Sequence, residues 1–172
     1  MEETAYAMRV RTSLPFEAAR AHVISALAGI GFGVLWEIDV RAKLKEKLGV
    51  EHPPYVILGA CNPKLAHRAL SLEREVGPLL PCNVIVYEEG AGSVVSILDP
   101  ARMMALAKNP ALEEVAAEAR RLLRGMLEKL FEGGGGWSFC QMPSCPPGWS
   151  RGQVMSPMMN CSRWAASRST SP

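Results

Sequence analysis

The feature that most constrains the fold is an abrupt change of composition at Gly133, where four glycines in a row begin. All 17 Asp and Glu residues lie before Gly133, and the last 40 residues contain no Asp, Glu, Lys, Ile or Leu. A segment of that composition cannot bury enough apolar surface to offset the entropy of ordering. The sequence therefore predicts one folded domain over residues 1–132, followed by a Gly-, Ser- and Pro-rich tail, residues 133–172, that is disordered or non-native.

The net charge is more informative about possible partners when residues 1–132 and the tail are counted separately. The formal net charge is +2, but 3 of the 19 Lys and Arg residues lie in the tail, so residues 1–132 are close to neutral. A near-neutral domain whose positive and negative side chains are interspersed lacks the clustered basic face that nucleic-acid binding requires. No apolar run reaches the roughly 18 residues that span a bilayer, and the acidic residues 1–4 do not resemble a signal peptide. We therefore expect a cytoplasmic protein with neither nucleic-acid nor membrane partners.

Hydrophobic periodicity predicts alternating strands and helices along residues 1–132. Apolar and polar residues alternate in a first strand around residues 6–11 and in a second strand, where Phe32, Val34, Trp36 and Ile38 are expected on one face. Apolar residues recur at helical spacing up to about Gly29, and again in a long last helix that begins near residue 110. Further strands are expected at 55–60, 83–88 and 93–98, and short helices at 40–48 and 63–73.

This order of elements predicts an α+β domain. A strand, a helix, four strands and a last helix, with two small helices inserted, favour an antiparallel sheet whose helices pack on one face. The glycines at positions 90 and 92 lie between two strands, so they are interpreted as a hairpin and not as a phosphate-binding loop.

Two cysteines are candidate site residues because of this topology. Cys61 directly follows the strand at 55–60, and Cys82 directly precedes the strand at 83–88. In an antiparallel pair the end of one strand and the start of the next lie at the same edge of the sheet. Asn62 and Asn83, and Asp99 at the end of the following strand, are expected at that edge as well.

Cys61 has a second notable feature, because the next two residues are typical of a helix start. Asn62 suits the N-cap and Pro63 suits the first helical position. Unpaired N–H groups at a helix start lower the pKa of a nearby thiol and favour bound anions. Two thiolates at one edge would also suit Cu(I) or Zn.

The candidate residues therefore fall into two groups. The candidate catalytic or soft-metal residues are Cys61 and Cys82, and the candidate ligand-binding residues are Asn62, Asn83, His67 and Asp99. The simpler alternative is that both cysteines are small buried apolar residues, that His67 lies at the surface, and that Asp99 forms a turn. Residues 1–132 contain no Ser, His and Asp arrangement typical of a catalytic triad, no Cys and His spacing typical of metal ligands, and no nucleotide-binding fingerprint. Whether the protein is an enzyme therefore stays open.

Two segments resemble a known family. Residues 57–63 (ILGACNP) and 79–84 (LLPCNV) are similar to the family called domain of unknown function 302, as are the flanking Gly31–Phe32 and residues 37–40. The similarity covers about residues 6–131 and excludes the tail. It implies a small domain with an architecture related to the TATA-binding-protein-like fold, often dimeric, with no established activity. The family pattern is carried by Cys61, Asn62, Pro63, Pro81, Cys82 and Asn83.

Three functions remain open at this point. The first is a homodimeric binding module with a site for an anion, a small ligand or a soft metal at the Cys61/Cys82 edge. The second is a thiol-dependent redox protein or enzyme in which Cys61 attacks and Cys82 resolves, which requires Cα atoms less than about 7 Å apart. The third is a structural or interaction domain that docks through a face of its sheet.

Overall fold

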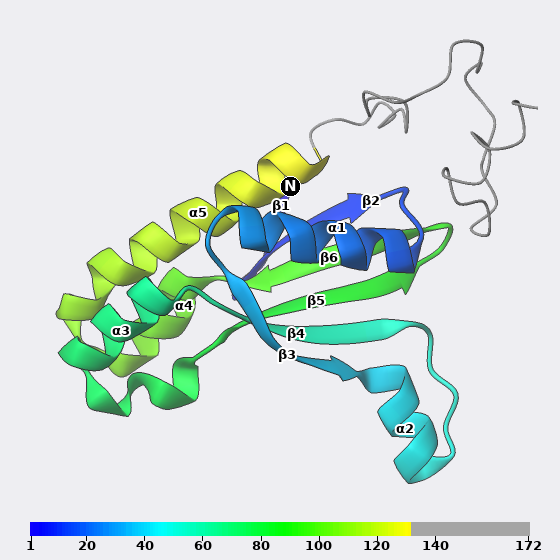
Figure 1. The fold of residues 1–172 in the computed structure, drawn as a ribbon, viewed down its shortest axis with the longest axis horizontal. Helices are drawn as coiled ribbons and strands as arrows, with labels where there is room; N and C mark the ends of the chain where they lie inside the picture. Colours follow the sequence, from blue (N-terminus) through cyan, green and yellow to red (C-terminus); the bar gives the residue numbers. More distant parts are fainter. Residues whose placement is uncertain (132–172) are drawn as a thin grey trace, which may run out of the picture. The chain divides into compact units, whose positions relative to one another are not determined.

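Six strands form one antiparallel sheet in the computed structural model, which describes residues 1–131 (Figure 1). The strands lie in the order β1-β2-β6-β5-β4-β3, and every neighbouring pair is antiparallel. Their bounds are β1 (Glu2–Glu3), β2 (Ala7–Thr12), β3 (Gly33–Asp39), β4 (Tyr55–Cys61), β5 (Cys82–Glu89) and β6 (Gly92–Leu98). The predicted α+β fold with an antiparallel sheet is confirmed. The predicted tail, residues 133–172, lies outside the described residues.

Helices cover one face of this sheet. Buried side chains of α1, α3 and α5, such as Val23, Leu65 and Leu123, pack with inward-facing strand residues such as Met8 and Val84. The helical segments are α1 (Phe16–Gly29), α2 (Val40–Leu48), α3 (Pro63–Leu72), η1 (Arg74–Leu79), α4 (Pro100–Met104), η2 (Ala105–Ala107), η3 (Pro110–Leu112) and α5 (Glu113–Phe131). α2 differs from the others because it has no buried residue and lies beyond the end of β3 (Figure 1).

A β-bulge interrupts the alternation in β3. Val34 lies opposite Ala60 of β4, whereas Trp36 lies opposite the next residue, Gly59, so Leu35 has no partner in β4. One extra residue in a strand moves every later side chain to the other face of the sheet. The bulge therefore divides β3 into two parts that face opposite ways.

The prediction that Phe32, Val34, Trp36 and Ile38 share one face is therefore wrong. Phe32 is buried in the core before the strand begins, and Trp36 and Ile38 lie on the side without helices. Glu37 lies instead on the helix side, where Nε of Arg20 in α1 donates to its carboxylate at 2.8 Å.

Asparagine and aspartate side chains start several helices. The predicted N-cap of α3 is confirmed, because the Asn62 side chain accepts hydrogen bonds from the N–H groups of Lys64 and Leu65 at 3.1 and 3.3 Å. Asp99 caps α4, a helix that the sequence did not predict because Asp99 was considered only as a site residue or as part of a turn. Gly90, with φ +62°, closes the predicted hairpin between β5 and β6.

The TATA-binding-protein-like order of elements stays a prediction from the resemblance. Within residues 1–131, no helix combines the length and the apolar character that crossing a bilayer demands.

Candidate functional site

The two cysteines lie at the same edge of the sheet. Cys82, the first residue of β5, pairs with Ala60 of β4, and Cys61 is the next and last residue of β4. Cys61 itself pairs with Gly33 at the start of β3. The topology thus brings the sulfur-bearing residues into neighbouring positions although 20 residues separate them along the chain.

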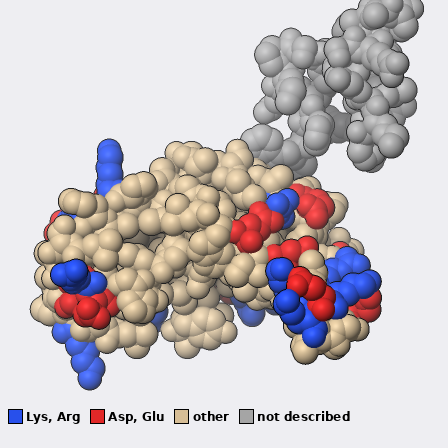
Figure 2. Space-filling view, turned by 60° about the horizontal axis from the view of Figure 1, so that its bottom comes forward, with Lys and Arg blue, Asp and Glu red and all other residues tan. Residues whose placement is uncertain are grey.

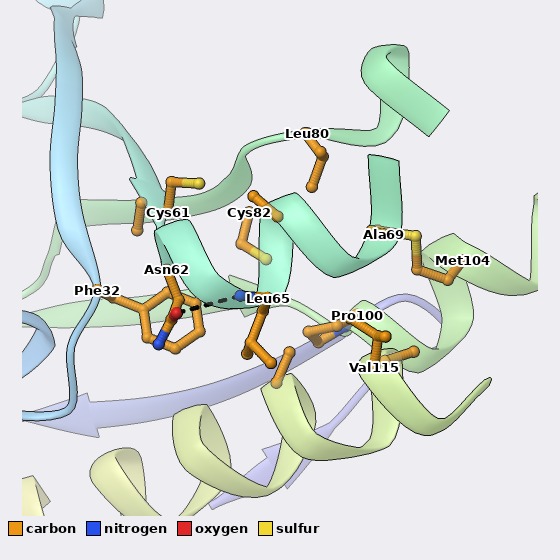
Figure 3. A pocket seen from close by; sticks show the side chains of 14 residues that line it. Phe32, Cys61, Asn62, Leu65, Ala69, Leu80, Cys82, Pro100, Met104 and Val115 are labelled. Carbon is orange, nitrogen blue, oxygen red and sulfur yellow. Dashed lines mark hydrogen bonds between the residues drawn. The ribbon is translucent and has the colours of Figure 1, made fainter. Parts of the chain in front are cut away.

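The two thiols leave this edge in opposite directions. Cys82 lies opposite Ala60 and shares its inward direction, so Cys61, one residue further along β4, faces the other way. Cys82 is 7% exposed and Cys61 is half-buried. Figure 3 shows the Cys82 sulfur pointing toward α3 and α5, whereas the Cys61 sulfur lies on the far side of its strand.

Burial raises the pKa of both thiols. For Cys82 the pKa rises from 9 to about 11, mainly because of burial and secondarily because Cys61 is close enough to add unfavourable charge. Burial also raises the pKa of Cys61. The prediction that the helix start makes Cys61 a low-pKa thiolate is therefore wrong, since desolvation of the charged form dominates.

Asn62 has a structural task at this edge. Its side-chain oxygen is occupied by the first N–H groups of α3, and its Nδ2 atom would lie 3.3 Å from a Cβ atom at Gly31. Gly31 has φ +80°, a left-handed conformation that favours glycine. The turn before β3 and the start of α3 are therefore packed against each other through the Asn62 amide.

The other three candidates are not brought together at the cysteines. Asn83 is exposed and pairs with Gly59 on the side of the sheet without helices. His67 is an exposed residue of α3. Asp99 is 4% exposed, and its carboxylate accepts from the N–H of Ala101 and from Nε of Arg120, both at 2.9 Å. Asp99 is thus fully engaged in holding α4 to α5.

A small apolar cavity lies beside Cys82, between the sheet edge and α3, α4 and α5. Its volume is about 30 Å³. Its walls are Phe32, Ala60, Cys61, Asn62, Leu65, Ala66, Ala69, Leu80, Cys82, Pro100, Met104, Val115, Ala116 and Ala119 (Figure 3). Met104 is a sulfur-bearing residue of this wall that the sequence did not indicate, because α4 was not predicted. Among residues 1–131, no three His, Cys, Asp or Glu side chains come together as metal ligands.

The sheet face without helices, here called the open face, is a larger feature whose residues the sequence analysis did not name. By register it includes the apolar or aromatic Trp36, Ile38, Tyr55, Ile57, Cys61, Ile85, Tyr87, Val94 and Leu98, together with the polar Arg9, Arg11, Asn83 and Ser96. The signal was present in residues 55–58, where every residue is apolar or aromatic instead of alternating with polar ones. Such a run is typical of a strand that is covered on both faces.

Close packing organises the aromatic residues of the open face. The rings of Tyr55 and Tyr87, paired across β4 and β5, stack with centroids 5.5 Å apart and an interplanar angle of 13°. The Trp36 indole lies directly over Gly59, where a Cβ atom would be 2.3 Å from the indole Cε2. Figure 2, which brings the β3 and α2 side of the molecule forward, shows a largely uncharged surface between two charged ends.

Comparisons with known proteins agree with this architecture. The model of the family described as Domain of unknown function DUF302 matches residues 8–130. A crystal structure of an uncharacterized conserved DUF302 protein from Bacillus stearothermophilus is similar, with 33% sequence identity and a TM-score of 0.69. The match covers 74% of this chain and 99% of that one. A search of curated proteins finds no match. On the family model and this structural relative, the chain belongs to the DUF302 family.

Proposed function

We propose that this domain is an interaction module whose open face docks a second copy of the same chain. The observation that supports the proposal is the apolar character of a sheet face that no helix covers. Ile38, Ile57 and Ile85 form a continuous row across β3, β4 and β5. An antiparallel sheet that faces water normally carries polar side chains on that side, and large exposed apolar patches mark interaction surfaces.

The shape of the open face, a sheet surface, suits a second copy as the occupant. Four strands at about 4.8 Å spacing and about five residues of each strand give a plan area of roughly 300 Å². The accessible area is larger than this plan area because the side chains protrude from the sheet. The exposed Leu35, Leu48 and Val50, in and after β3, extend the apolar surface. The plan area alone is smaller than the roughly 800 Å² per partner of a standard interface, so these neighbouring residues are part of the proposed surface. Two sheets can pack face to face at about 10 Å.

The charges of the open face also permit an interface between identical surfaces. Its two cationic side chains, Arg9 and Arg11, are both paired within the chain. Nε of Arg9 donates to Glu2 at 2.8 Å, and Nε of Arg11 donates to Glu89 at 2.7 Å, while Arg11 also contacts Glu2. Because each cation has its own anion, two copies of this face meet without unbalanced like charges.

A matched pair of substitutions tests the docking proposal. Ile57→Lys places a charge at the centre of the open face, whereas Leu106→Lys changes a 72% exposed leucine of η2. Sedimentation velocity should show a dimer for the wild type and for Leu106→Lys, and a monomer with unchanged circular dichroism for Ile57→Lys. A wild-type chain that stays monomeric at about 100 μM, a concentration at which a standard interface associates, would refute the proposal.

A second candidate function is a small-ligand or soft-metal module at the Cys61/Cys82 edge. The observation that favours it is the Cys82 thiol beside the apolar cavity. The anion version has less support because the Asn62 oxygen is occupied in the cap and both thiol pKa values are raised. The redox version has less support because the two sulfurs leave opposite faces of the sheet. Free thiols of this kind suit a reducing cytoplasm, which we propose as the compartment.

A further inference from the structure

α2 is the helix that the domain covers least. Among the α-helices of residues 1–131, it alone buries no side chain, and it lies beyond the end of β3 (Figure 1). Its ends are fixed locally: Asp39 accepts from the N–H of Ala42 at 2.9 Å, and the N–H of Gly49 donates to the carbonyl of Lys45 at 3.0 Å. A helix of nine residues gains little from its caps alone, because isolated helices of this length are marginal in water. Contact with another molecule would therefore stabilise α2.

The apolar side of α2 begins where the open face ends. Val40, Leu44 and Leu48 are spaced four residues apart, so they share one side of the helix. Val40 and Leu44 are half-buried, whereas Leu48 is 69% exposed. Ile38 of the open face precedes the helix by two residues. An interface that covers the open face can therefore extend onto α2.

We infer that α2 is a docking arm that packs against the β5–β6 hairpin of a second copy of this chain. The inference rests on the docking function proposed above and says which segments meet in the dimer. The open face alone, with a plan area of roughly 300 Å², is smaller than a standard interface of roughly 800 Å² per partner. In a two-fold dimer each copy contributes its own arm and receives the other, so α2 adds roughly 270 Å² of plan area to each partner.

The position of α2 along the strands selects the hairpin as its partner. Asp39 pairs with Val56 of β4, and the neighbouring Tyr55 pairs with Tyr87 of β5, so α2 and the β5–β6 hairpin lie at the same end of the sheet. The row of isoleucines on the open face is centred on β4. A two-fold axis that runs parallel to β4 leaves this end of the strands in place and exchanges the two sides of the sheet. The arm beyond β3 of one copy then lies over the partner's hairpin.

The charges of the two segments are complementary. The cations of α2 outnumber its single anion, Glu46, by three: Arg41, Lys43, Lys45 and Lys47. The three lysines are paired locally with Glu46 or Glu51 at 2.8–2.9 Å, whereas Arg41 has no ion-pair partner within residues 1–131. Glu88, exposed at the end of β5, has no ion-pair partner in the described part of the chain either. Opposite charges on two facing segments favour their association and fix their register.

The alternative two-fold arrangement lacks this complementarity. An axis perpendicular to the strands would carry α2 to the other end of the partner's sheet. The open-face residues at that end, Cys61, Asn83 and Leu98, carry no charge. The charges of α2 and of the hairpin therefore favour the axis parallel to the strands.

Hydrogen exchange measured by mass spectrometry tests the arm. The full chain at about 100 μM is compared with Ile57→Lys, which is expected to be monomeric. The amides of α2 should exchange at least about tenfold faster in Ile57→Lys than in the wild-type dimer. The amides of α3 should exchange alike in both, because Leu65 and Ala69 pack in the core of their own chain. Equal exchange of α2 in dimer and monomer would overturn the inference and leave the docking function standing, whereas a monomeric wild type would overturn both.

Charge exchange tests the partner segment. Arg41→Glu and Glu88→Arg should each weaken the dimer by roughly tenfold, because each change acts twice in a two-fold dimer, and the double variant should recover most of the lost affinity. Arg74→Glu is the control and should dimerise like the wild type, since this exposed arginine belongs to η1 at the other end of the sheet. Sedimentation velocity measures the dissociation constants, and circular dichroism checks that each variant is folded. A double variant that dimerises no better than the single variants would overturn the pairing of α2 with the hairpin.

Discussion

Substituting Gly59 tests the packing that defines the open face. A Cβ atom at this position would lie 2.3 Å from Cε2 and 2.5 Å from Nε1 of the Trp36 indole, distances at which the ring has to move away. Trp36 is 37% exposed, so nearly two thirds of its surface is buried. With about 250 Å² for a tryptophan side chain and about 25 cal/mol per Å², complete displacement costs up to about 4 kcal/mol. Partial displacement, together with the gain from removing a strand glycine, lowers the expected cost of Gly59→Ala to about 2 kcal/mol.

The effect of Gly59→Ala on the free energy of unfolding should change sign when the indole is absent. In a Trp36→Ala background, Gly59→Ala has no ring to displace and should stabilise the fold by about 0.5–1 kcal/mol. Urea unfolding followed by far-UV circular dichroism measures all four members of this cycle, at several protein concentrations because association shifts apparent stability. Gly125→Ala in α5, where an added Cβ atom meets nothing within 4 Å, is the control and should be stabilising. A neutral or stabilising Gly59→Ala in the wild-type background would show that the indole does not rest on Gly59.

Three further predictions concern Asp99 and the thiols. Asp99→Ala should cost about 2–4 kcal/mol in urea unfolding, because a helix cap and a charged hydrogen bond to Arg120 are lost at a buried site. Asp39→Ala removes an exposed cap of the same 2.9 Å length and should cost about 1 kcal/mol or less; equal costs would contradict the role of Arg120. Alkylation followed by mass spectrometry should modify Cys61 faster than Cys82 at neutral pH, and equal rates would show that Cys82 is not buried. The pKa of Cys82 is raised to about 11, so the folded state keeps a proton that the unfolded state loses above about 9. The free energy of unfolding should therefore fall as the pH rises from 9 to 11, and Cys82→Ser should remove this fall.

The order of elements could be predicted from the sequence because local signals mark most boundaries. The β-rich run of residues 93–98, the Asn62–Pro63 cap and the last amphipathic helix each depend on neighbours in the chain. The short helix α4 was missed because a five-residue helix has no room for a periodic pattern. Its cap, Asp99, is stabilised by α5 residues that are distant in sequence.

The candidate site was predictable in position but not in direction. Antiparallel pairing brings Cys61 and Cys82 to one edge, and this follows from the order of strands alone. The directions of the thiols depend on the register, since Cys82 pairs with Ala60 and not with Cys61. A shift by one residue reverses a side chain, and no local motif specifies the register to that accuracy. The low pKa expected for Cys61 was wrong for a related reason, because burial depends on the complete fold.

The bulge at Leu35 gives β3 two possible registers with the same amino-acid sequence. If Leu35 entered the ladder opposite Gly59, regular pairing would turn the tryptophan beneath α1 and bring the glutamate that follows it out to the solvent. A slip of one residue would thus exchange an apolar outer surface for an acidic one without substituting any amino acid. Deletion of Leu35 would remove this choice, because the tryptophan would still lie opposite Gly59 and the glutamate opposite Leu58, so related chains that lack the extra residue should keep the apolar surface.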